Sequence, residues 1–361
     1  MKIALIVTNL VGGGAEKVMI KLAAGLAGRG HEIHLILLEH LIEHAPPPQV
    51  AVHALTGANQ RLSKGVLGKW AAAWRLRRLL RRLGGQRPFD LVVSTLPFAD
   101  EVAVRGRLPR HWCRIADTLS TEIARLRRSS PRKAARRLRR YHKLYDHRRL
   151  IAVSDGVADD LRGPLGIRGA RIERVYNPFD LAVIRARATE PAALPPRPYV
   201  IHIGRFSRQK RHDVLLDAWA RLDVPHRLVL LVAPDPQLSD MISKRGLDQR
   251  VTIAGFQANP YPWIAAADLL VLSSDHEGLP NVIIEALALG TPVVSTDCPA
   301  GPREILGERF ADFLVPVGDA AALAGAMARA LVEPPDMSQV DLARFDAPTV
   351  WAAYERLAAD G

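Results

Sequence analysis

The sequence predicts an α/β protein that contains two open parallel sheets, one after the other. Short apolar runs alternate with stretches of helical period, a pattern typical of βαβ units. The pattern loosens after residue 180 and begins again after the proline-rich residues 189–198, where a stiff connector is expected. The length of 361 residues also exceeds what one hydrophobic core usually supports. We therefore assign residues 1–180 to a first domain and residues 181–361 to a second.

The first domain begins with a predicted strand, glycine loop and helix. Residues 3–8 are almost purely apolar, Gly12, Gly13 and Gly14 follow, and a helical period then continues to residue 28. Glycine lacks a Cβ atom, so the loop admits a ligand close to main-chain amides, although a tight turn that serves only packing explains it about as well. Glu16 suits the positive end of the helix dipole. Further strands are expected at residues 33–38, 91–94 and 150–153.

The second domain repeats the same order of elements. Residues 199–203 form a predicted strand, Gly204 a turn and residues 214–219 part of a helix. Sheets of this kind bind ligands outside the carboxyl ends of their strands, so we expect a site in a cleft between the two domains. Residues 350–359 have helical spacing and can pack back on the first domain. The other expected strands are residues 228–232, 251–253, 269–272 and 292–295.

Composition excludes several classes of protein. Hydrophobic residues make up 48% of the chain and charged residues 24%, which is ordinary for a soluble globular protein. No window reaches the ~18 uninterrupted apolar residues of a membrane span, and the apolar start of the chain has no cleavage-like site. We expect a cytoplasmic protein. Cys113 and Cys298 are interpreted as reduced, buried thiols, because two distant cysteines form neither a disulfide framework nor a metal site.

Positive charge is concentrated in the first half of the chain. Residues 1–180 hold 33 Lys and Arg against 15 Asp and Glu, whereas residues 181–361 hold 17 against 22. Within the first half, residues 61–149 carry 25 basic and 6 acidic side chains. A patch of this kind attracts phosphates on nucleic acid, on anionic lipid or on a lipid diphosphate. The alternative is an arginine-rich composition that places Arg on any solvated helix face.

Two carboxylates stand eight positions apart in the second domain, with a Gly-Leu-Pro-Asn turn between them. Pro280 suits a first helical turn and Gly290 suits the residue after a helix, which places Glu277 in a loop and Glu285 on the helix. Glu285 lies among apolar residues, and a carboxylate is rarely buried there without a partner, which favours a function over an ordinary polar helix position. The pair also invites interpretation as glycosidase acids.

Two cations argue against the glycosidase interpretation. Arg205 and Lys210 flank a predicted strand-to-helix turn. The planar guanidinium of an arginine can bind two phosphate oxygens and the ammonium group of a lysine is a mobile point charge, so together they suit a diphosphate. The alternative is a solvated turn that happens to be basic. No Asp-x-Asp triplet occurs in the chain, and the nearest metal-like triplet is Asp275-His276-Glu277. We therefore predict that the two cations replace a metal, and that neither a metal nor another cofactor is needed.

The second domain closely resembles the nucleotide-sugar domain of retaining glycosyltransferases of family 4, which have the two-domain GT-B architecture. Four segments match in the right order: Gly204-Arg205 with Lys210, Glu277 to Asn281, Glu285-Ala286 through Gly290 to Val293, and Thr296 to Glu304. The first domain resembles the family more loosely, through the Gly12 to Glu16 loop, Ala152 to Val157 and Tyr176-Asn177-Pro178. The resemblance therefore covers nearly the whole chain.

The resemblance implies a role for each matched residue. Arg205 and Lys210 would hold the donor diphosphate, Glu277 and the amides after it the transferred sugar, and Glu285 the ribose hydroxyls. Gly13 and Gly14, with Glu16 beside them, would approach the diphosphate and the acceptor from the first domain. Family members retain the anomeric configuration, so stabilising the departing diphosphate would be the main catalytic task. The remaining donor-binding residues would be Gly204, Gly278, Leu279, Pro280 and Asn281.

One stretch departs from the family pattern. Many members carry a histidine at the end of a first-domain strand near the reacting sugar, but residues 114–120 contain none. Asp117 or Thr118 is expected in its place.

Within the family, the segments Glu-Gly-Leu-Pro-Asn (residues 277–281) and Cys-Pro-Ala-Gly-Pro-Arg-Glu (residues 298–304) are most similar to those of one group of transferases. These enzymes use UDP-activated hexoses or N-acetylhexosamines to build surface polysaccharides or lipid-linked oligosaccharides. A lipid-linked acceptor would suit the basic half, with residues 70–83 and 132–149 contacting an anionic membrane, each nearby cation adding ~1 kcal/mol. The protein would then be peripheral on the inner face of the plasma membrane. Two solvated helices packed on the sheet would explain the same residues.

Three other functions remain open. A sugar-nucleotide epimerase of the same architecture would turn over without an acceptor. A nucleic-acid-binding protein would account for the calculated pI of about 10.2, but no aromatic-plus-basic nucleic-acid motif is present, so no nucleic acid is expected as a partner. A scaffold would bind nucleotide sugar without turnover.

Overall fold

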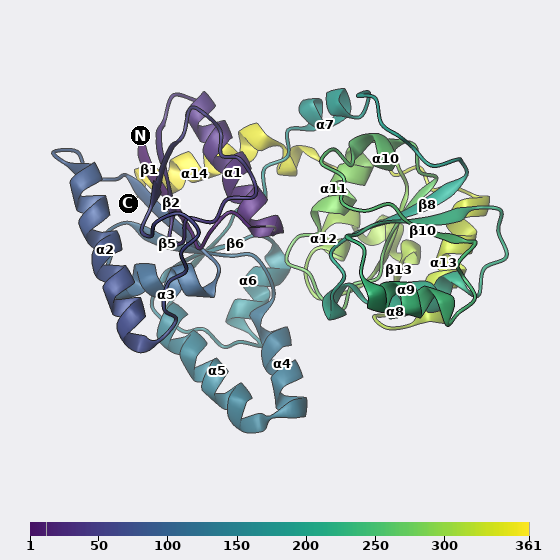
Figure 1. Ribbon diagram of the computed structural model, residues 1–361, viewed down its shortest axis with the longest axis horizontal. Coiled ribbons are helices and arrows are strands. Elements are labelled where there is room, and N and C mark those ends of the chain that lie inside the picture. The colour runs from purple at the N-terminus through teal and green to yellow at the C-terminus, as the bar shows by residue number, and fades with distance from the viewer. Residues whose placement is uncertain (12, 361) are drawn as a thin grey trace. The chain divides into compact units, whose positions relative to one another are not determined.

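The computed structural model describes residues 1–11 and 13–360, and it divides the chain into two compact units (Figure 1). Unit 1 holds Met1–Pro178 together with the C-terminal segment from Ala347, and unit 2 holds Phe179–Asp346. The proline-rich residues 189–198 lie inside unit 2, because Asp268 accepts hydrogen bonds from the Arg197 side chain and the Tyr199 amide. The expected connector is therefore part of this unit's surface.

Unit 1 contains an open parallel sheet, as the sequence predicts, and this sheet has seven strands. Its strand order is β3-β2-β1-β4-β5-β6-β7. The four expected strands are present. The sequence did not indicate β3 and β7, which have four residues each and are only partly buried, or β5, which contains His111 and Arg114. The strands are β1 (Lys2–Val7), β2 (Glu32–Leu37), β3 (Ala51–Ala54), β4 (Leu91–Thr95), β5 (His111–Ile115), β6 (Arg149–Ala152) and β7 (Arg171–Arg174).

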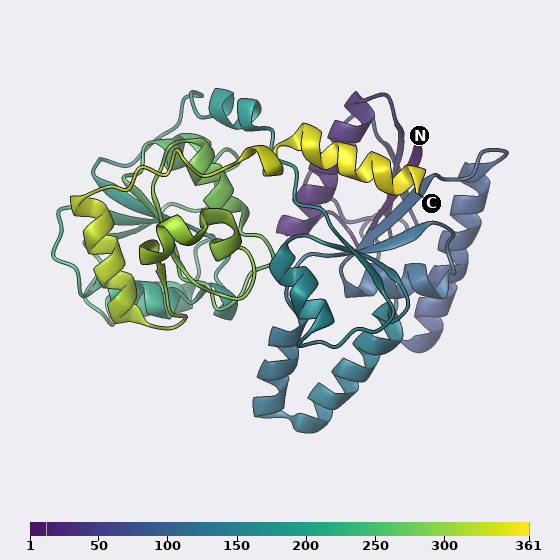
Figure 2. The ribbon, with the colours of Figure 1, turned by 180° about the vertical axis from the view of Figure 1, so that it is seen from behind.

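Helices cover the sheet of unit 1, and the last of them comes from the end of the chain (Figure 2). This helix, α14 (Ala347–Ala359), contacts α1, where a Cβ atom on Gly25 would lie 2.0 Å from the Trp351 ring. No helix among the described residues is both long and apolar enough to cross a membrane. The others are α1 (Gly14–Gly28), α2 (Val66–Gly84), α3 (Pro97–Arg105), α4 (Leu119–Ser129), α5 (Pro131–Tyr145) and α6 (Asp155–Arg162).

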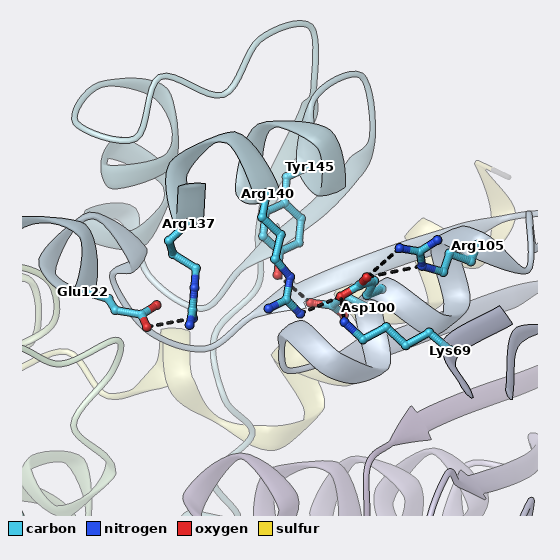
Figure 3. A network of polar contacts seen from close by, with 8 residues as sticks. Lys69, Asp100, Arg105, Glu122, Arg137, Arg140 and Tyr145 are labelled. Carbon is cyan, nitrogen blue, oxygen red and sulfur yellow. Dashed lines mark hydrogen bonds and ion pairs between the residues drawn. The ribbon is translucent and has the colours of Figure 1, made fainter. Parts of the chain in front are cut away.

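Ion pairs to one carboxylate join three helices of unit 1 (Figure 3). Glu101 on α3 accepts from Lys69 on α2 at 2.9 Å, from Arg105 at 2.8 Å and from Arg140 on α5 at 2.5 Å. Burial alone would raise the pKa of Glu101, but these three cations lower it to about 2. We call Glu101 with its three cations the Glu101 cluster.

Unit 2 contains a six-stranded parallel sheet in the order β10-β9-β8-β11-β12-β13. Because β8 and β11 are neighbours, the loops that follow them meet at the carboxyl edge of the sheet. The strands are β8 (Tyr199–Ile203), β9 (Arg227–Leu231), β10 (Val251–Ile253), β11 (Leu269–Leu272), β12 (Val293–Thr296) and β13 (Leu314–Val315). The α-helices are α7 (Leu181–Arg187), α8 (His212–Trp219), α9 (Pro236–Ser243), α10 (Tyr261–Ala265), α11 (Asn281–Ala288), α12 (Pro302–Leu306) and α13 (Ala320–Val332). Three short 3-10 helices are η1 (Arg208–Lys210), η2 (Glu308–Phe313) and η3 (Ala343–Phe345).

Candidate functional site

A lysine and a glutamate meet where the loops after β8 and β11 come together in unit 2. Lys210 Nζ donates to Glu277 Oε1 at 2.6 Å, and the two side chains are only 18% and 10% exposed. The loops are also joined through the main chain, since Asp275 N donates to Gln209 O at 2.8 Å. Two residues 67 positions apart in the sequence therefore form one charge pair at the carboxyl edge of the sheet.

Two glycines make this arrangement sterically possible. A Cβ atom on Gly204 would lie 3.2 Å from the Lys210 stem, so the lysine packs closely over the turn after β8. Gly301 has a φ of +95°, and a Cβ atom there would lie 2.2 Å from Pro280. The turn after Glu277 therefore packs against the loop that follows β12.

Arg211, which sequence reasoning missed, holds the loop of Lys210 in place. Its backbone is left-handed, with a φ of 48°, and its guanidinium donates to Asp213 and, at 2.8 Å, to Asp275. Both carboxylates raise its pKa. Asp275 is thus engaged by an arginine. The sequence shows Lys210 and Arg211 only as adjacent cations, and nothing in it indicates which one positions the other's loop.

The surroundings of Lys210 keep nearby groups uncharged. Burial, followed by the charge of Lys210, lowers the pKa of His212 to about 4. Burial and then the charge of Glu277 raise the pKa of the Cys298 thiol. Both cysteines are free and buried, as predicted. His212 and Cys298 therefore add no charge to the Lys210–Glu277 pair.

Arg205 and Glu285 have different surroundings. Arg205 is exposed in the loop after β8, and within the described part of the chain it forms no ion pair with a carboxylate. Glu285 lies on α11 with 9% exposure and hydrogen-bonds Tyr261 on α10, whose pKa is raised by burial and then by the charge of Glu285. The helix α11 begins at Asn281, so Pro280 stands one residue before it, and Gly278 and Leu279 lie in the preceding turn.

The predicted residues of unit 1 lie at the carboxyl ends of β1 and β5. Glu16 is buried at the start of α1 and folds toward Gly13, where a Cβ atom would lie 1.8 Å from its carboxylate. Gly14 is the first residue of that helix, and Gly12 lies outside the described residues. Asp117 accepts from the Thr118 amide at 2.8 Å, and Thr118 is buried at the start of α4. Among the described residues, no three His, Cys, Asp or Glu side chains are grouped to hold a metal ion.

Comparisons with known proteins identify the class of protein. A family model for "Glycosyltransferase Family 4" matches residues 12–183, and one for "Glycosyl transferases group 1" matches residues 197–333. The fold is similar to that of sucrose-phosphate synthase from Thermosynechococcus elongatus, with a TM-score of 0.77, 20% identity and coverage of 100% of this chain and 98% of the other. The chain is a glycosyltransferase with the GT-B fold, as the sequence predicts. The model for family 4 covers about the first half of the chain, and the group 1 model covers most of the second half.

The chain is also similar to transferases of known substrate and to a protein whose structure contains UDP and glucose. The N-acetylgalactosamine-N,N'-diacetylbacillosaminyl-diphospho-undecaprenol 4-alpha-N-acetylgalactosaminyltransferase of Campylobacter jejuni is 29% identical over 324 residues, which are 88% of this chain and 86% of that protein. The lipopolysaccharide 1,6-galactosyltransferase of Salmonella typhimurium is 30% identical over 167 residues, 43% of this chain and 45% of that one. The Anabaena protein HepE in complex with UDP and glucose has a TM-score of 0.74 at 20% identity, with 100% of both chains covered.

Proposed function

We propose that this glycosyltransferase moves a hexose or N-acetylhexosamine from a nucleotide sugar, preferably a UDP-sugar, to a lipid-linked or polysaccharide acceptor. The transfer retains the anomeric configuration and needs no metal ion. The observation that carries the proposal is the Lys210–Glu277 pair at the carboxyl edge of the sheet of unit 2. Open parallel sheets bind their ligands at this edge.

The pair suits a donor that brings both a diphosphate and a sugar. Without donor, Lys210 and Glu277 neutralise each other. With donor, Lys210 turns to the diphosphate, joined by the exposed Arg205, and Glu277 accepts hydrogen bonds from the sugar hydroxyls. Glu285, on the helix that follows, accepts from the ribose hydroxyls. The two cations thus provide the charge that a metal ion would otherwise supply.

The proposed reaction proceeds on one face of the sugar. The bond between the anomeric carbon and the diphosphate oxygen breaks, the acceptor oxygen bonds to the same carbon, and the acceptor proton passes to a leaving phosphate oxygen. Charge therefore develops on the diphosphate. Once the bound donor has drawn Lys210 and Arg205 to it, the two cations stabilise this charge without further reorganisation in the transition state. In unit 1, Gly13, Gly14, Asp117 and Thr118 lie at strand ends that would face the acceptor.

A membrane-bound acceptor is supported by one surface of α2. This helix exposes Leu67, Trp70 and Trp74, with exposed fractions of 85%, 51% and 62%. The Arg78 guanidinium lies 5.5 Å from the centre of the Trp74 ring, and Arg75, the residue after Trp74, is exposed. Indole rings flanked by arginines suit the interface of an anionic membrane, where the protein would be peripheral on the inner face of the plasma membrane. The Campylobacter relative is named for a substrate carried on diphospho-undecaprenol.

The direct test is nucleotide release from UDP-sugars, with and without a lipid-linked acceptor. We expect release only with acceptor, in the presence of EDTA, and a loss of roughly 10²-fold or more in Arg205→Ala and Glu277→Ala. Arg208→Ala, three residues from Arg205 and also exposed, serves as the matched control. Unchanged turnover in both site variants would reject the assignments. Conversion of the sugar nucleotide without acceptor would instead indicate the epimerase.

A further inference from the structure

A basic cavity of about 280 Å³ lies in unit 1 at the edge of the sheet where β5 and β6 begin. The proposed acceptor residues follow the opposite, carboxyl ends of the strands. The cavity is formed by the loop between α3 and β5 and the loop between α5 and β6. Its lining consists of six basic and two apolar residues, without a carboxylate: Val104, Arg107, Leu108, Arg110, His111, His147, Arg148 and Arg149.

The positive charge of this cavity is poorly balanced. Arg107 and Arg148 are exposed, and neither forms an ion pair within the described part of the chain. Arg110 reaches Asp90 only at 3.4 Å, and Arg149 lies over the Trp112 ring at 5.8 Å. Burial, followed by the charge of Arg148, lowers the pKa of His111 to about 3. Several cations are therefore held together with almost no opposing charge.

The backbone around the cavity is strained. Arg107, Arg110 and His147 have φ values of 48°, 49° and 57°, so three of the seven described non-glycine residues with positive φ line one cavity. A left-handed conformation costs such a residue roughly 1 to 2 kcal/mol. Strain of this kind gathers at ligand clamps and active sites. Like-charged side chains on strained loops are a costly arrangement unless an anion compensates for it.

We propose that this cavity binds a phosphate or diphosphate group, at a site separate from the nucleotide-sugar site proposed in unit 2. Arginine forks match phosphate oxygens in pairs, and a small cavity lined on both sides by such forks selects a compact anion. The group belongs either to the head of an anionic lipid or to a soluble phosphate compound. Both present the same oxygens to Arg107 and Arg148.

The test is hydrogen exchange of the whole protein with and without inorganic pyrophosphate at constant ionic strength. We expect protection of residues 105–112 and 146–150, and at least tenfold weaker pyrophosphate binding at this site in Arg107→Gln/Arg148→Gln. Arg127→Gln/Arg128→Gln, two exposed arginines at the end of α4, is the matched control and should behave as wild type. Protection of residues 204–211 reports on the proposed donor site independently, so the two proposals can fail separately.

Vesicles distinguish the two sources of phosphate. If a lipid head group is the ligand, vesicles of phosphatidylglycerol should protect the same two segments in wild type and in the control, but not in Arg107→Gln/Arg148→Gln. If the ligand is soluble, pyrophosphate should protect them and vesicles should not. No protection by either probe, or equal protection in both double variants, would overturn the proposal.

Discussion

Two buried glutamates of this protein differ in how many cations surround them. Glu277 in unit 2 meets one lysine, Lys210, whereas Glu101 in unit 1 meets Lys69, Arg105 and Arg140. The two carboxyl groups are almost equally buried. The difference therefore lies in their partners rather than in their exposure to water.

The number of cationic partners distinguishes a carboxylate that can bind a ligand from one that only stabilises the fold. A carboxylate with one mobile ammonium group can exchange it for a ligand, and the lysine is then free for an anion. A carboxylate with three cations from three helices can release none of them without leaving buried charge unpaired. We expect Glu277 to determine turnover and Glu101 to determine stability.

The largest effect is expected at Glu277. Glu277→Gln keeps the shape of the side chain but removes its charge, so sugar hydroxyls lose a charged acceptor and Lys210 loses its partner. Turnover of UDP-sugar with acceptor should fall 10² to 10³-fold, while the melting temperature should fall less than that of Glu101→Gln, because one cation rather than three loses its carboxylate. Steady-state kinetics and thermal unfolding of the same preparation measure both. A large loss of stability in Glu277→Gln, with normal turnover in the protein that remains folded, would show that Glu277 has the structural role that we assign to Glu101.

Glu101→Gln should show the opposite behaviour. It leaves Lys69, Arg105 and Arg140 facing one another without a carboxylate, which destabilises unit 1 by about 3 kcal/mol. Urea unfolding gives this value. Glu173→Gln is the control, because Glu173 pairs with Arg171 on an exposed strand and should change the free energy of unfolding very little. If the turnover of Glu101→Gln falls further than its folded fraction does, the Glu101 cluster also affects the catalytic site.

The sequence predicts the two sheets better than it predicts the Lys210–Glu277 pair or the Glu101 cluster. Apolar runs reveal β1, β2 and β4 because these strands are covered on both faces, whereas β5 carries His111 and Arg114 inside the sheet and shows no such run. The motif around Glu277 is visible in sequence, and so is Lys210. Their contact depends on β8 lying next to β11, and strand order is a property of the folded chain.

Only one pair of the Glu101 cluster has a local signal in the sequence, the i,i+4 spacing of Glu101 and Arg105 on α3. Lys69 is 32 residues from Glu101 and Arg140 is 39, so no motif spacing connects them. Their charges are also common in a segment with 25 basic residues. Only the packing of α2, α3 and α5 shows which of these cations share a carboxylate.

A third effect concerns Asp100, the neighbour of Glu101 on α3. Asp100 is fully buried, accepts from Ser94 and Tyr145, and burial raises its pKa to about 7. The raised pKa means that its contribution to stability is present at low pH and is lost as pH rises from about 4 through about 7. Over pH 5 to 7 the loss should be about 2 to 3 kcal/mol.

Asp100→Asn isolates this contribution. The amide stays neutral, so the free energy of unfolding of the variant should decline less than that of wild type between pH 5 and 8. Urea unfolding at each pH measures the difference, and groups other than Asp100 cancel in it. Parallel curves for the two proteins would show that Asp100 is charged like Glu101, and adjacent carboxyls on α3 would then have the same charge state.

The smallest effect is expected at Glu355, whose side chain is 22% exposed and whose partner Arg29 is 39% exposed. Glu355 on α14 accepts from Arg29 at 2.7 and 2.9 Å and from His31 at 2.7 Å, and the hydrogen bonds of these two groups lower its pKa to about 2. Its contribution is thus present above about pH 4 and lost as pH falls through about 2. Because water screens the pair, Glu355→Gln at pH 7 should lower the melting temperature by less than about 2 °C.

In 1 M NaCl this shift should vanish, whereas the shift from Glu101→Gln should largely persist, since buried pairs are screened much less. Equal salt sensitivity of the two shifts would mean that burial is not what distinguishes the Glu101 cluster from a surface ion pair.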